Sequence, residues 1–275
     1  WDAAGVVEAV GPGVTLFKPG DAVYFAGDIT RPGSNAEYTL VDERIAALKP
    51  ATLDFAQAAA LPLTAITAWE ALFDRLGLSP DGASAGQRVL VIGGAGGVAS
   101  IAIQLARQAG LHVIATASRP ETEAWVRELG AHEVLNHRGD LVAQLNAVGG
   151  PVGHIFLTTD TDDYFPQLPQ LLAPQGRVCG IVDNREPLPL NLLKPKSQAF
   201  LWEMMFARPM HQTPDMIEQH RLLTRVAQWV DAGRVRTTLQ KVLRPINAAN
   251  LRAAHAQLES GTTIGKVVLE GWASK

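Results

Sequence analysis

The chain has 275 residues, of which 47% are hydrophobic and 19% charged, and its formal net charge is −3. This length and composition allow a sizeable core, which excludes a disordered protein and a small scaffold held together by disulfides. The small net charge gives no overall reason to expect nucleic acid or an anionic membrane as a partner.

The first 66 residues are predicted to form an all-β region. Its strands are expected at short apolar runs separated by Gly, Pro and Asp residues, namely Val6-Val7, Val23-Tyr24 and Tyr38 to Val41. The period then changes, because apolar side chains at 69, 72, 73 and 76 predict a helix over 67–76. The Gly/Ser/Pro-rich segment 77–86 ends this helix.

From residue 89 onward, strands and helices alternate. Strands are predicted at 89–92, 111–116, 133–136, 153–158 and 177–182, and helices at 97–109, 120–129, 139–147 and 162–172. This alternation predicts an α/β fold, a doubly wound parallel sheet of the Rossmann type with helices on both faces. Further on, we predict a Pro-rich loop at 183–196, a strand within 198–206, an amphipathic helix at 215–232 and a closing strand at 266–269.

One uncharged run, residues 89–106, is long enough to be mistaken for a membrane span. Its four glycines indicate a strand, a tight turn and a helix instead. The turn reads Gly94, Ala95, Gly96, Gly97, Val98, Ala99 and fits the pattern G-x-G-x-x-A. Such glycines let the backbone approach a pyrophosphate, and the following helix N-terminus supplies N–H donors. A turn that only packs a helix on a strand is the alternative, but the place at the start of a βαβαβ series favours a dinucleotide.

The acidic residue that usually binds the ribose of NAD is missing. It is expected at the end of the second strand, yet residues 82–120 contain no Asp or Glu, and the strand ends in Ser118 and Arg119. An arginine there can bind the 2′-phosphate of NADP(H), and Ser118 can add a hydrogen bond. The alternatives are a solvated Arg119 and a capping box formed by Ser118 with Glu121. We predict NADPH as the cofactor.

An ordered set of motifs along the whole chain resembles the medium-chain dehydrogenase/reductase superfamily. The set comprises Asp2-Ala-Ala-Gly5, Gly20-Asp21-x-Val23, Ala36-Glu37-Tyr38, Ala58 to Pro62, Thr67-Ala-Trp69, the glycine turn and Gly265-Lys266-Val-Val-Leu269. The chain is most similar to quinone oxidoreductases and to proteins labelled zinc-type alcohol dehydrogenase-like. The resemblance implies a split GroES-like β domain (1–66), a Rossmann NADP-binding domain (67–206) and a C-terminal return to the β domain (207–275).

The resemblance also implies residues before Trp1 that carry part of the substrate pocket, so we expect the chain to be truncated. It bears on zinc as well. Zinc-dependent relatives have a histidine where this chain has Trp1, before Asp2, and a cysteine where it has Leu63. Their structural zinc loop has four cysteines, and segment 24–36 has none. Because indole and hydrocarbon groups do not bind zinc, we predict an enzyme without zinc.

Further site residues follow from the resemblance alone. Thr158, Gly180 and Ile181 are expected beside the nicotinamide, and His137 near the adenosine phosphate, with an ordinary surface histidine as the alternative. Thr67 is expected near the nicotinamide as the candidate catalytic residue, with a helix N-cap as the alternative. The remaining cofactor-side candidates are Phe206 and Lys266. The aromatic segment 200–206 is interpreted as an edge strand or a subunit interface.

The single cysteine, Cys179, cannot form an internal disulfide, and it indicates a reducing compartment, which we take to be the cytoplasm. We interpret it as a buried strand residue rather than a nucleophile. Residues 219–258 carry seven basic residues and one acid, which raises nucleic-acid binding as an alternative, but the charges are spread out without interleaved aromatic residues. Solvated surfaces explain them better.

Together these observations predict an NADPH-dependent, zinc-independent oxidoreductase that transfers hydride to a quinone or another α,β-unsaturated carbonyl. A zinc-type alcohol dehydrogenase and a non-catalytic NADPH- or nucleic-acid-binding protein of the same fold remain the alternatives. The expected partners are the small-molecule substrate and a second copy in a homodimer, with no membrane.

Overall fold

The computed structural model describes residues 1–272 and divides the chain into two compact units. Unit 1 contains residues 1–66 together with the chain from Met205 onward, and unit 2 contains Thr67–Met204. Each unit has its own sheet structure.

Unit 2 is built on a six-stranded sheet in which every neighbouring pair of strands is parallel. Its strands are β4 (Arg88–Ile92), β5 (His112–Thr116), β6 (Glu133–Leu135), β7 (Val152–Leu157), β8 (Leu172–Gly180) and β9 (Ala199–Trp202). They lie in the order β6-β5-β4-β7-β8-β9, so the chain winds outward in both directions from β4. The predicted α/β fold with a doubly wound parallel sheet is confirmed, and segment 198–206 provides an edge strand.

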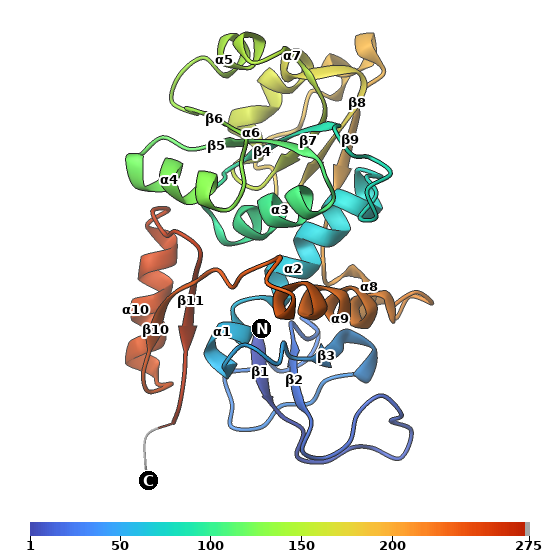
Figure 1. Cartoon of the computed structure of the whole chain (residues 1–275), viewed down its shortest axis with the longest axis vertical. Helices are drawn as coiled ribbons and strands as arrows, with labels where there is room; N and C mark the ends of the chain where they lie inside the picture. The colour runs from blue at the N-terminus through green and yellow to red at the C-terminus, as the bar shows by residue number, and fades with distance from the viewer. Residues whose placement is uncertain (273–275) are drawn as a thin grey trace. The chain divides into compact units, whose positions relative to one another are not determined.

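Helices cover both faces of this sheet (Figure 1). They are α3 (Gly97–Gln108), α4 (Pro120–Glu128), α5 (Leu141–Ala147), α6 (Thr161–Tyr164) and α7 (Leu168–Leu171). Leu90 and Ile92 of β4 belong to the core cluster that includes buried side chains of α5 and α7. Because side chains alternate along a strand, the buried Val89 and Val91 face the opposite side, toward α3 and α4.

The helix predicted at 162–172 is confirmed as a helical segment over 161–171, but it is not one regular α-helix. Only short pieces form: α6, a 3-10 turn at Phe165–Gln167 and α7, after which Leu172 already begins β8. Pro166 and Pro169 explain the interruption, because proline has no N–H to donate and its ring clashes with a continuing α-helix.

Unit 1 contains a three-stranded antiparallel sheet of β1 (Ala3–Val6), β2 (Ala22–Phe25) and β3 (Ala46–Leu48). A 3-10 turn at Glu43–Ile45 precedes β3. The strand predicted at Tyr38 to Val41 is wrong: this segment is irregular, and both Tyr38 and Leu40 are largely exposed. Among residues 1–272, no strand pairs with this segment, so its apolar alternation does not produce a strand.

The prediction that residues 1–66 are all β is also wrong, because two helices begin there. Helix α1 (Phe55–Ala59) starts at a capping box of Asp54 and Gln57, and α2 (Pro62–Trp69) starts with a proline at its first position. The helix predicted from residue 67 therefore begins earlier, at Pro62. It passes into a π-helical turn over Glu70–Arg75.

The C-terminal part of unit 1 contains α8 (Ala207–His211), α9 (Glu218–Asp231), β10 (Leu239–Leu243), α10 (Ala248–Glu259) and β11 (Lys266–Leu269). The predicted helix at 215–232 and the closing strand at 266–269 are confirmed. Strands β10 and β11 pair in parallel, and α10 connects them. The buried Tyr24 hydroxyl of β2 donates a 2.6 Å hydrogen bond to the Leu223 carbonyl and so fastens α9 to the antiparallel sheet.

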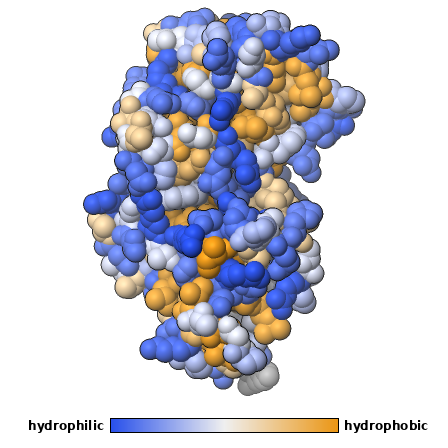
Figure 2. All heavy atoms as spheres, turned by 90° about the vertical axis from the view of Figure 1, so that its right-hand side faces the viewer, coloured by the Kyte–Doolittle hydropathy of each residue, from blue (hydrophilic) through white to orange (hydrophobic). Residues whose placement is uncertain are grey.

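No helix among the described residues is long and apolar enough to cross a membrane. The predicted Pro-rich loop contains only short 3-10 turns, at Leu190–Leu192 and Lys194–Lys196. On the face shown in Figure 2, apolar surface lies in several patches separated by hydrophilic side chains. Hydropathy on this face therefore does not single out one binding area.

A histidine cluster in unit 2 makes stability depend on pH. The rings of His112 and His132 stack with centroids 4.3 Å apart, and the Arg107 guanidinium contacts His132 Nε2. Burial, followed by the charges of Arg107 and His112, lowers the pKa of His132 below its ordinary 6.5. Protonation therefore favours the unfolded state, and stability is lost as pH falls below 6.5.

We expect the melting temperature to fall on acidification from about pH 7 to about pH 5, and to fall less in His132→Asn. Differential scanning fluorimetry across this range measures the effect. Replacement of the exposed His211 by Asn is the matched control, and an acid sensitivity unchanged by His132→Asn would contradict the prediction.

Candidate functional site

The glycine turn between β4 and α3 is shaped by close packing against β5. The N–H of Gly93, at φ +93°, donates to Thr116 Oγ1 at 3.0 Å, and the N–H of Gly94 donates to the Thr116 carbonyl at 3.1 Å. A Cβ on Gly94 would come within 2.8 Å of that carbonyl and 3.0 Å of Val126 Cγ1. No side chain fits at Gly94 without displacement of the turn.

The start of α3 suits an anion. Its N-cap is Gly96, so no side-chain cap occupies the first N–H groups of this 12-residue helix. Ala95, Gly97 and Val98 are half-buried and remain reachable. The turn therefore fits a dinucleotide pyrophosphate, which would rest on N–H donors at the positive end of the helix dipole.

Other predicted residues lie at the same edge of the sheet, where all parallel strands end. The Thr158 hydroxyl, just after β7, donates to the Ile92 carbonyl at 2.8 Å and lies against Gly93. Gly180 ends β8, where a Cβ would come within 2.9 Å of the Phe200 ring. Ile181 follows it and is half-buried. These residues adjoin the site, and their contact with the nicotinamide stays a prediction.

Ser118 and Arg119 come after β5, separated from it by Ala117, and are half-buried. The capping-box alternative for Ser118 is wrong, because Arg119 is the N-cap of α4 and its N–H donates to Thr122 Oγ1 at 3.1 Å. The Arg119 Nε forms an ion pair with Glu121 at 3.0 Å, so the guanidinium is not simply solvated. Both Ser118 and Arg119 therefore remain candidates for the 2′-phosphate.

His137 lies beside this pair of residues. The Ala117 N–H donates to the Leu135 carbonyl at 2.9 Å, which places the end of β5 against the end of β6. Burial, the charge of Arg138 and the charge of Arg119, in that order, lower the pKa of His137. The position next to Arg119 agrees with a place near the adenosine phosphate, which stays a prediction.

The remaining predicted residues are placed as follows. Thr67 lies inside α2 and is buried, so its N-cap alternative is wrong. Phe206 and Lys266 belong to unit 1, whereas the glycine turn belongs to unit 2. The buried Phe206 ring packs edge-on to Trp1 with centroids 6.4 Å apart. The cofactor contacts predicted for Thr67, Phe206 and Lys266 remain predictions.

The positions that the resemblance assigns to zinc ligands have a different chemistry here. The Trp1 indole N–H donates to the Asp28 carbonyl at 3.0 Å, and its ring covers Gly33. Asp2 forms a 2.6 Å ion pair with Lys266 and accepts the Leu63 N–H at 2.6 Å. An ammonium group thus balances the carboxylate, and Leu63 offers only hydrocarbon.

A zinc ion does not fit this donor set, since zinc sites need three or four N, S or O ligands. Among residues 1–272, no group of three or more His, Cys, Asp or Glu side chains could hold a metal ion. The Asp2–Lys266 ion pair joins opposite ends of the chain, and sequence reasoning missed it because nothing local signals it.

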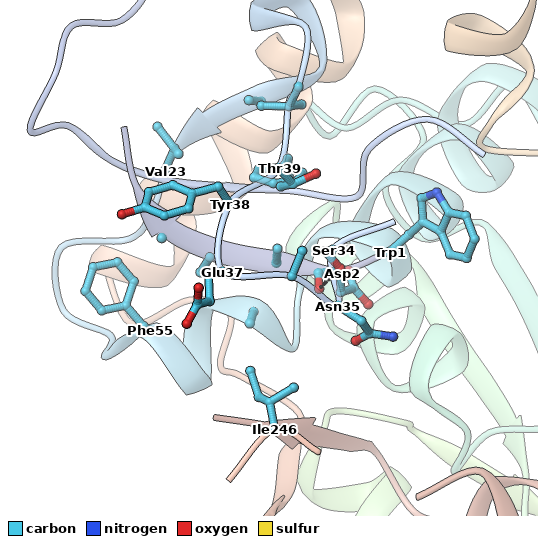
Figure 3. A pocket seen from close by; sticks show the side chains of 18 of the residues that line it. Trp1, Asp2, Val23, Ser34, Asn35, Glu37, Tyr38, Thr39, Phe55 and Ile246 are labelled. Carbon is cyan, nitrogen blue, oxygen red and sulfur yellow. Dashed lines mark hydrogen bonds between the residues drawn. The ribbon is translucent and has the colours of Figure 1, made fainter. Parts of the chain in front are cut away.

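The Asp2–Lys266 pair lines a cavity of about 880 Å³ within unit 1. Figure 3 shows Asp2, Ser34 and Asn35 together, while the Tyr38 and Phe55 rings lie on either side of the Glu37 carboxylate. The Ser34 hydroxyl donates to the Asp2 carbonyl at 3.2 Å. The cavity therefore combines an end that contains an ion pair with an end where aromatic rings and a carboxylate lie together.

A second ion pair, which lies in unit 2, was also missed. Arg75 Nε lies 2.9 Å from Glu203, whose side chain is fully buried, and the Glu203 N–H donates to the Gly180 carbonyl. The only signal in the sequence is one acid within an otherwise apolar segment, 199–206. The neighbouring Cys179 is confirmed as a buried strand residue, and burial followed by the Glu203 charge raises its pKa to about 12. A thiol of that pKa is a poor nucleophile.

The basic stretch 219–258 is partly neutralised within unit 1. Arg221 pairs with Glu218, Arg244 pairs with Glu270, and Arg225 lies over the Trp229 ring at 5.0 Å. These contacts favour the interpretation as ordinary surface charges over a nucleic-acid surface.

Comparisons with known proteins agree with the resemblance to dehydrogenases and reductases. The sequence model of the family described as zinc-binding dehydrogenase matches residues 129–269. A zinc-type alcohol dehydrogenase-like protein of Staphylococcus aureus is 47% identical over 270 residues, which are 98% of this chain and 81% of that protein. A solved Rhizobium etli protein, provisionally described as a zinc-dependent alcohol dehydrogenase, is 56% identical with a TM-score of 0.95, over 100% of this chain and 80% of the other. Escherichia coli quinone oxidoreductase, solved with NADPH, is 25% identical with a TM-score of 0.83, over 98% and 81%.

Proposed function

We propose, because the chain belongs to the zinc-binding dehydrogenase family, that it reduces a quinone or another α,β-unsaturated carbonyl with NADPH and without zinc. The chain is an oxidoreductase of the medium-chain dehydrogenase/reductase superfamily. The observation that carries the finer proposal is the replacement of the zinc donor set by an indole, a leucine and the Asp2–Lys266 ion pair. Arg119 and Ser118 at the end of β5 support NADPH over NADH.

When bound, NADPH supplies the hydride. The chain contributes binding and orientation: the turn at Gly94 and Gly96 receives the pyrophosphate, and Arg119 receives the 2′-phosphate. A simple carbonyl needs an electrophile such as zinc to stabilise its developing charge. A conjugated acceptor delocalises that charge and so suits a site without zinc, with the proton drawn from solvent or a pocket hydroxyl.

A zinc-type alcohol dehydrogenase is the second candidate. The names of the Staphylococcus aureus and Rhizobium etli relatives favour it. The donor groups at Trp1 and Leu63 disfavour it, because they cannot complete a zinc site.

The test is NADPH oxidation by the purified protein with a quinone, an enone and an aldehyde in parallel. Turnover of the quinone or the enone without the aldehyde is the expected result. Activity on the aldehyde alone, with bound zinc, would overturn the proposal in favour of the second candidate. Tight NADPH binding without any turnover would favour a non-catalytic role.

Metal content is a separate prediction. We expect substoichiometric zinc by plasma mass spectrometry of protein purified without chelators, because Trp1 and Leu63 replace two donors. Incubation with a chelator is expected to leave NADPH oxidation unchanged. Stoichiometric zinc, removed together with activity, would contradict this.

The proposal also includes a homodimer in the cytoplasm. The free, buried Cys179 supports a reducing compartment, because no disulfide stabilises the chain. The exposed Trp202 on edge strand β9 and the adjacent exposed Met204 offer apolar surface for a second copy. Light scattering coupled to gel filtration tests the oligomeric state.

A further inference from the structure

Two hydrogen-bonded side chains connect helix α4 to the glycine turn. The indole N–H of Trp125, in α4, donates to Ser100 Oγ in α3 at 2.8 Å. The Ser100 hydroxyl donates to the carbonyl oxygen of Ala95 at 3.4 Å. Ala95 belongs to the turn that is proposed to receive the pyrophosphate. A tryptophan from outside the turn is therefore linked to the backbone of the turn itself.

The indole nitrogen orients the Ser100 hydroxyl. A hydroxyl has one proton to donate and lone pairs to accept, whereas an indole N–H only donates. Because Trp125 donates to Ser100 Oγ, the hydroxyl proton points away from the indole, toward the Ala95 carbonyl. Ser100 is fully buried, so water does not compete for the hydroxyl, and bonds in such a chain strengthen one another. Without the indole, the hydroxyl could instead bond the carbonyl of Gly96, four residues earlier, as helix serines often do.

The residue next to Trp125 packs against the same turn. A Cβ on Gly94 would lie 3.0 Å from Val126 Cγ1, and Val126 is fully buried. The glycines have no side chains that could fix the turn, and Gly96, as the N-cap of α3, makes no side-chain hydrogen bond. The place of the turn therefore depends on its neighbours, namely on β5 through Thr116 and on α4 through Val126 and Trp125.

We infer that Trp125 is a positioning residue for the cofactor pyrophosphate. Through Ser100 it holds the Ala95 carbonyl, so that the N–H groups at the start of α3 stay directed at the pyrophosphate. Trp125 need not touch the cofactor to do this. The inference rests on the proposed binding of the cofactor at this turn. Because NADPH and NADH share the pyrophosphate, loss of the indole N–H weakens the binding of both equally, in contrast to loss of Arg119.

Trp125→Phe removes the N–H and keeps an aromatic ring. We expect the dissociation constants of NADPH and NADH to rise by about threefold to tenfold with an unchanged ratio, since one neutral hydrogen bond is lost. The KM for NADPH should rise in parallel while kcat at saturating NADPH stays the same, as expected for uniform binding. Ser100→Ala interrupts the same chain and should have a similar effect. The double variant should then bind little worse than either single one.

The competitor adenosine 2′-monophosphate separates positioning from a general disturbance of unit 2. It carries the 2′-phosphate but lacks the pyrophosphate, so its inhibition constant against NADPH should be the same in the wild type, Trp125→Phe and Ser100→Ala. Trp229→Phe is the matched control, because it makes the same chemical change at a buried tryptophan in α9 of unit 1. It is expected to leave both cofactor affinities unchanged. Fluorescence titration of the whole protein with each cofactor measures them.

Failure of this inference and failure of the proposed function give different results. If Trp125→Phe and Ser100→Ala bind both cofactors as the wild type does, if their effects add in full, or if adenosine 2′-monophosphate weakens in parallel, Trp125 does not position the turn and the proposed function stands. If the wild type does not prefer NADPH, or turns over neither quinone nor enone, the proposed function is wrong, and NADH binding by the same variants still tests Trp125. If neither cofactor binds, both are wrong.

Discussion

Replacement of Gly94 by alanine is expected to weaken NADPH binding by about tenfold to a hundredfold and to lower the free energy of unfolding by about 1–3 kcal/mol. The added Cβ would meet the Thr116 carbonyl at 2.8 Å, Val126 Cγ1 at 3.0 Å and Ala115 Cβ at 3.2 Å. Backbone and two buried side chains cannot move aside cheaply, so the turn itself must shift. The N–H groups at the start of α3 would then move away from the pyrophosphate.

Gly153→Ala is the matched control, because a Cβ at Gly153 would meet nothing within 4 Å, and this glycine lies in β7 of the same unit. Fluorescence titration with NADPH and chemical denaturation measure the two effects. Equal NADPH affinity in the Gly94→Ala and Gly153→Ala variants would show that the turn does not hold the cofactor.

The sheet of unit 2 was predictable because its signals are local. Strands such as Val89 to Ile92 are buried on both faces and appear as continuous apolar runs, and this strand is followed by the amphipathic helix α3. The glycine turn and the missing acid before Arg119 are also local. The order of the strands follows from the βαβ connections, so little long-range information was needed.

Unit 1 was less predictable because its pairings are long-range. Strand β10 (Leu-Gln-Lys-Val-Leu) is half polar, and its partner β11 lies beyond α10 in the chain. Tyr38 to Val41 shows the opposite case, because its alternating residues pair with no strand in the part of the chain that the structure describes. Whether each of these two segments forms a strand depends on its partner strand and on the register of the pairing. A short stretch of sequence determines neither of these.

The ion pairs Asp2–Lys266 and Arg75–Glu203 also depend on long-range contacts that local sequence patterns do not reveal. The sequence suggested that Trp1 and Leu63 cannot bind zinc, which is a property of single residues. That Lys266 balances Asp2, or that Arg75 pairs with the buried Glu203, depends on how distant segments meet. Sequence reasoning therefore identified which groups were missing, and the structure identified which groups took their place.

Replacement of Arg119 by alanine is expected to weaken NADPH binding by about tenfold to a hundredfold and to leave NADH binding nearly unchanged. One charge-assisted hydrogen bond to the 2′-phosphate, which NADH lacks, accounts for an effect of about 1.5–3 kcal/mol. The ratio of the dissociation constants of the two cofactors, measured by fluorescence titration, reports the change. Arg127→Ala, in the last turn of the same helix α4, is the matched control.

A second variant, at Glu121, tests the role of Arg119 further. Its carboxylate lies 3.0 Å from the Arg119 Nε, so the phosphate must compete with it for the guanidinium. Both side chains are partly exposed, and such pairs contribute at most about 1 kcal/mol. Glu121→Gln should therefore tighten NADPH binding by up to about fivefold.

If Glu121 acts through Arg119, the gain from Glu121→Gln should shrink when Arg119 is already alanine, because non-additivity reports coupling between neighbours. An equal gain in both backgrounds would mean that Glu121 repels the phosphate directly. An unchanged NADPH/NADH ratio in Arg119→Ala would remove Arg119 from the site altogether. The four proteins of this cycle thus separate a guanidinium that binds the phosphate from one that only pairs with Glu121.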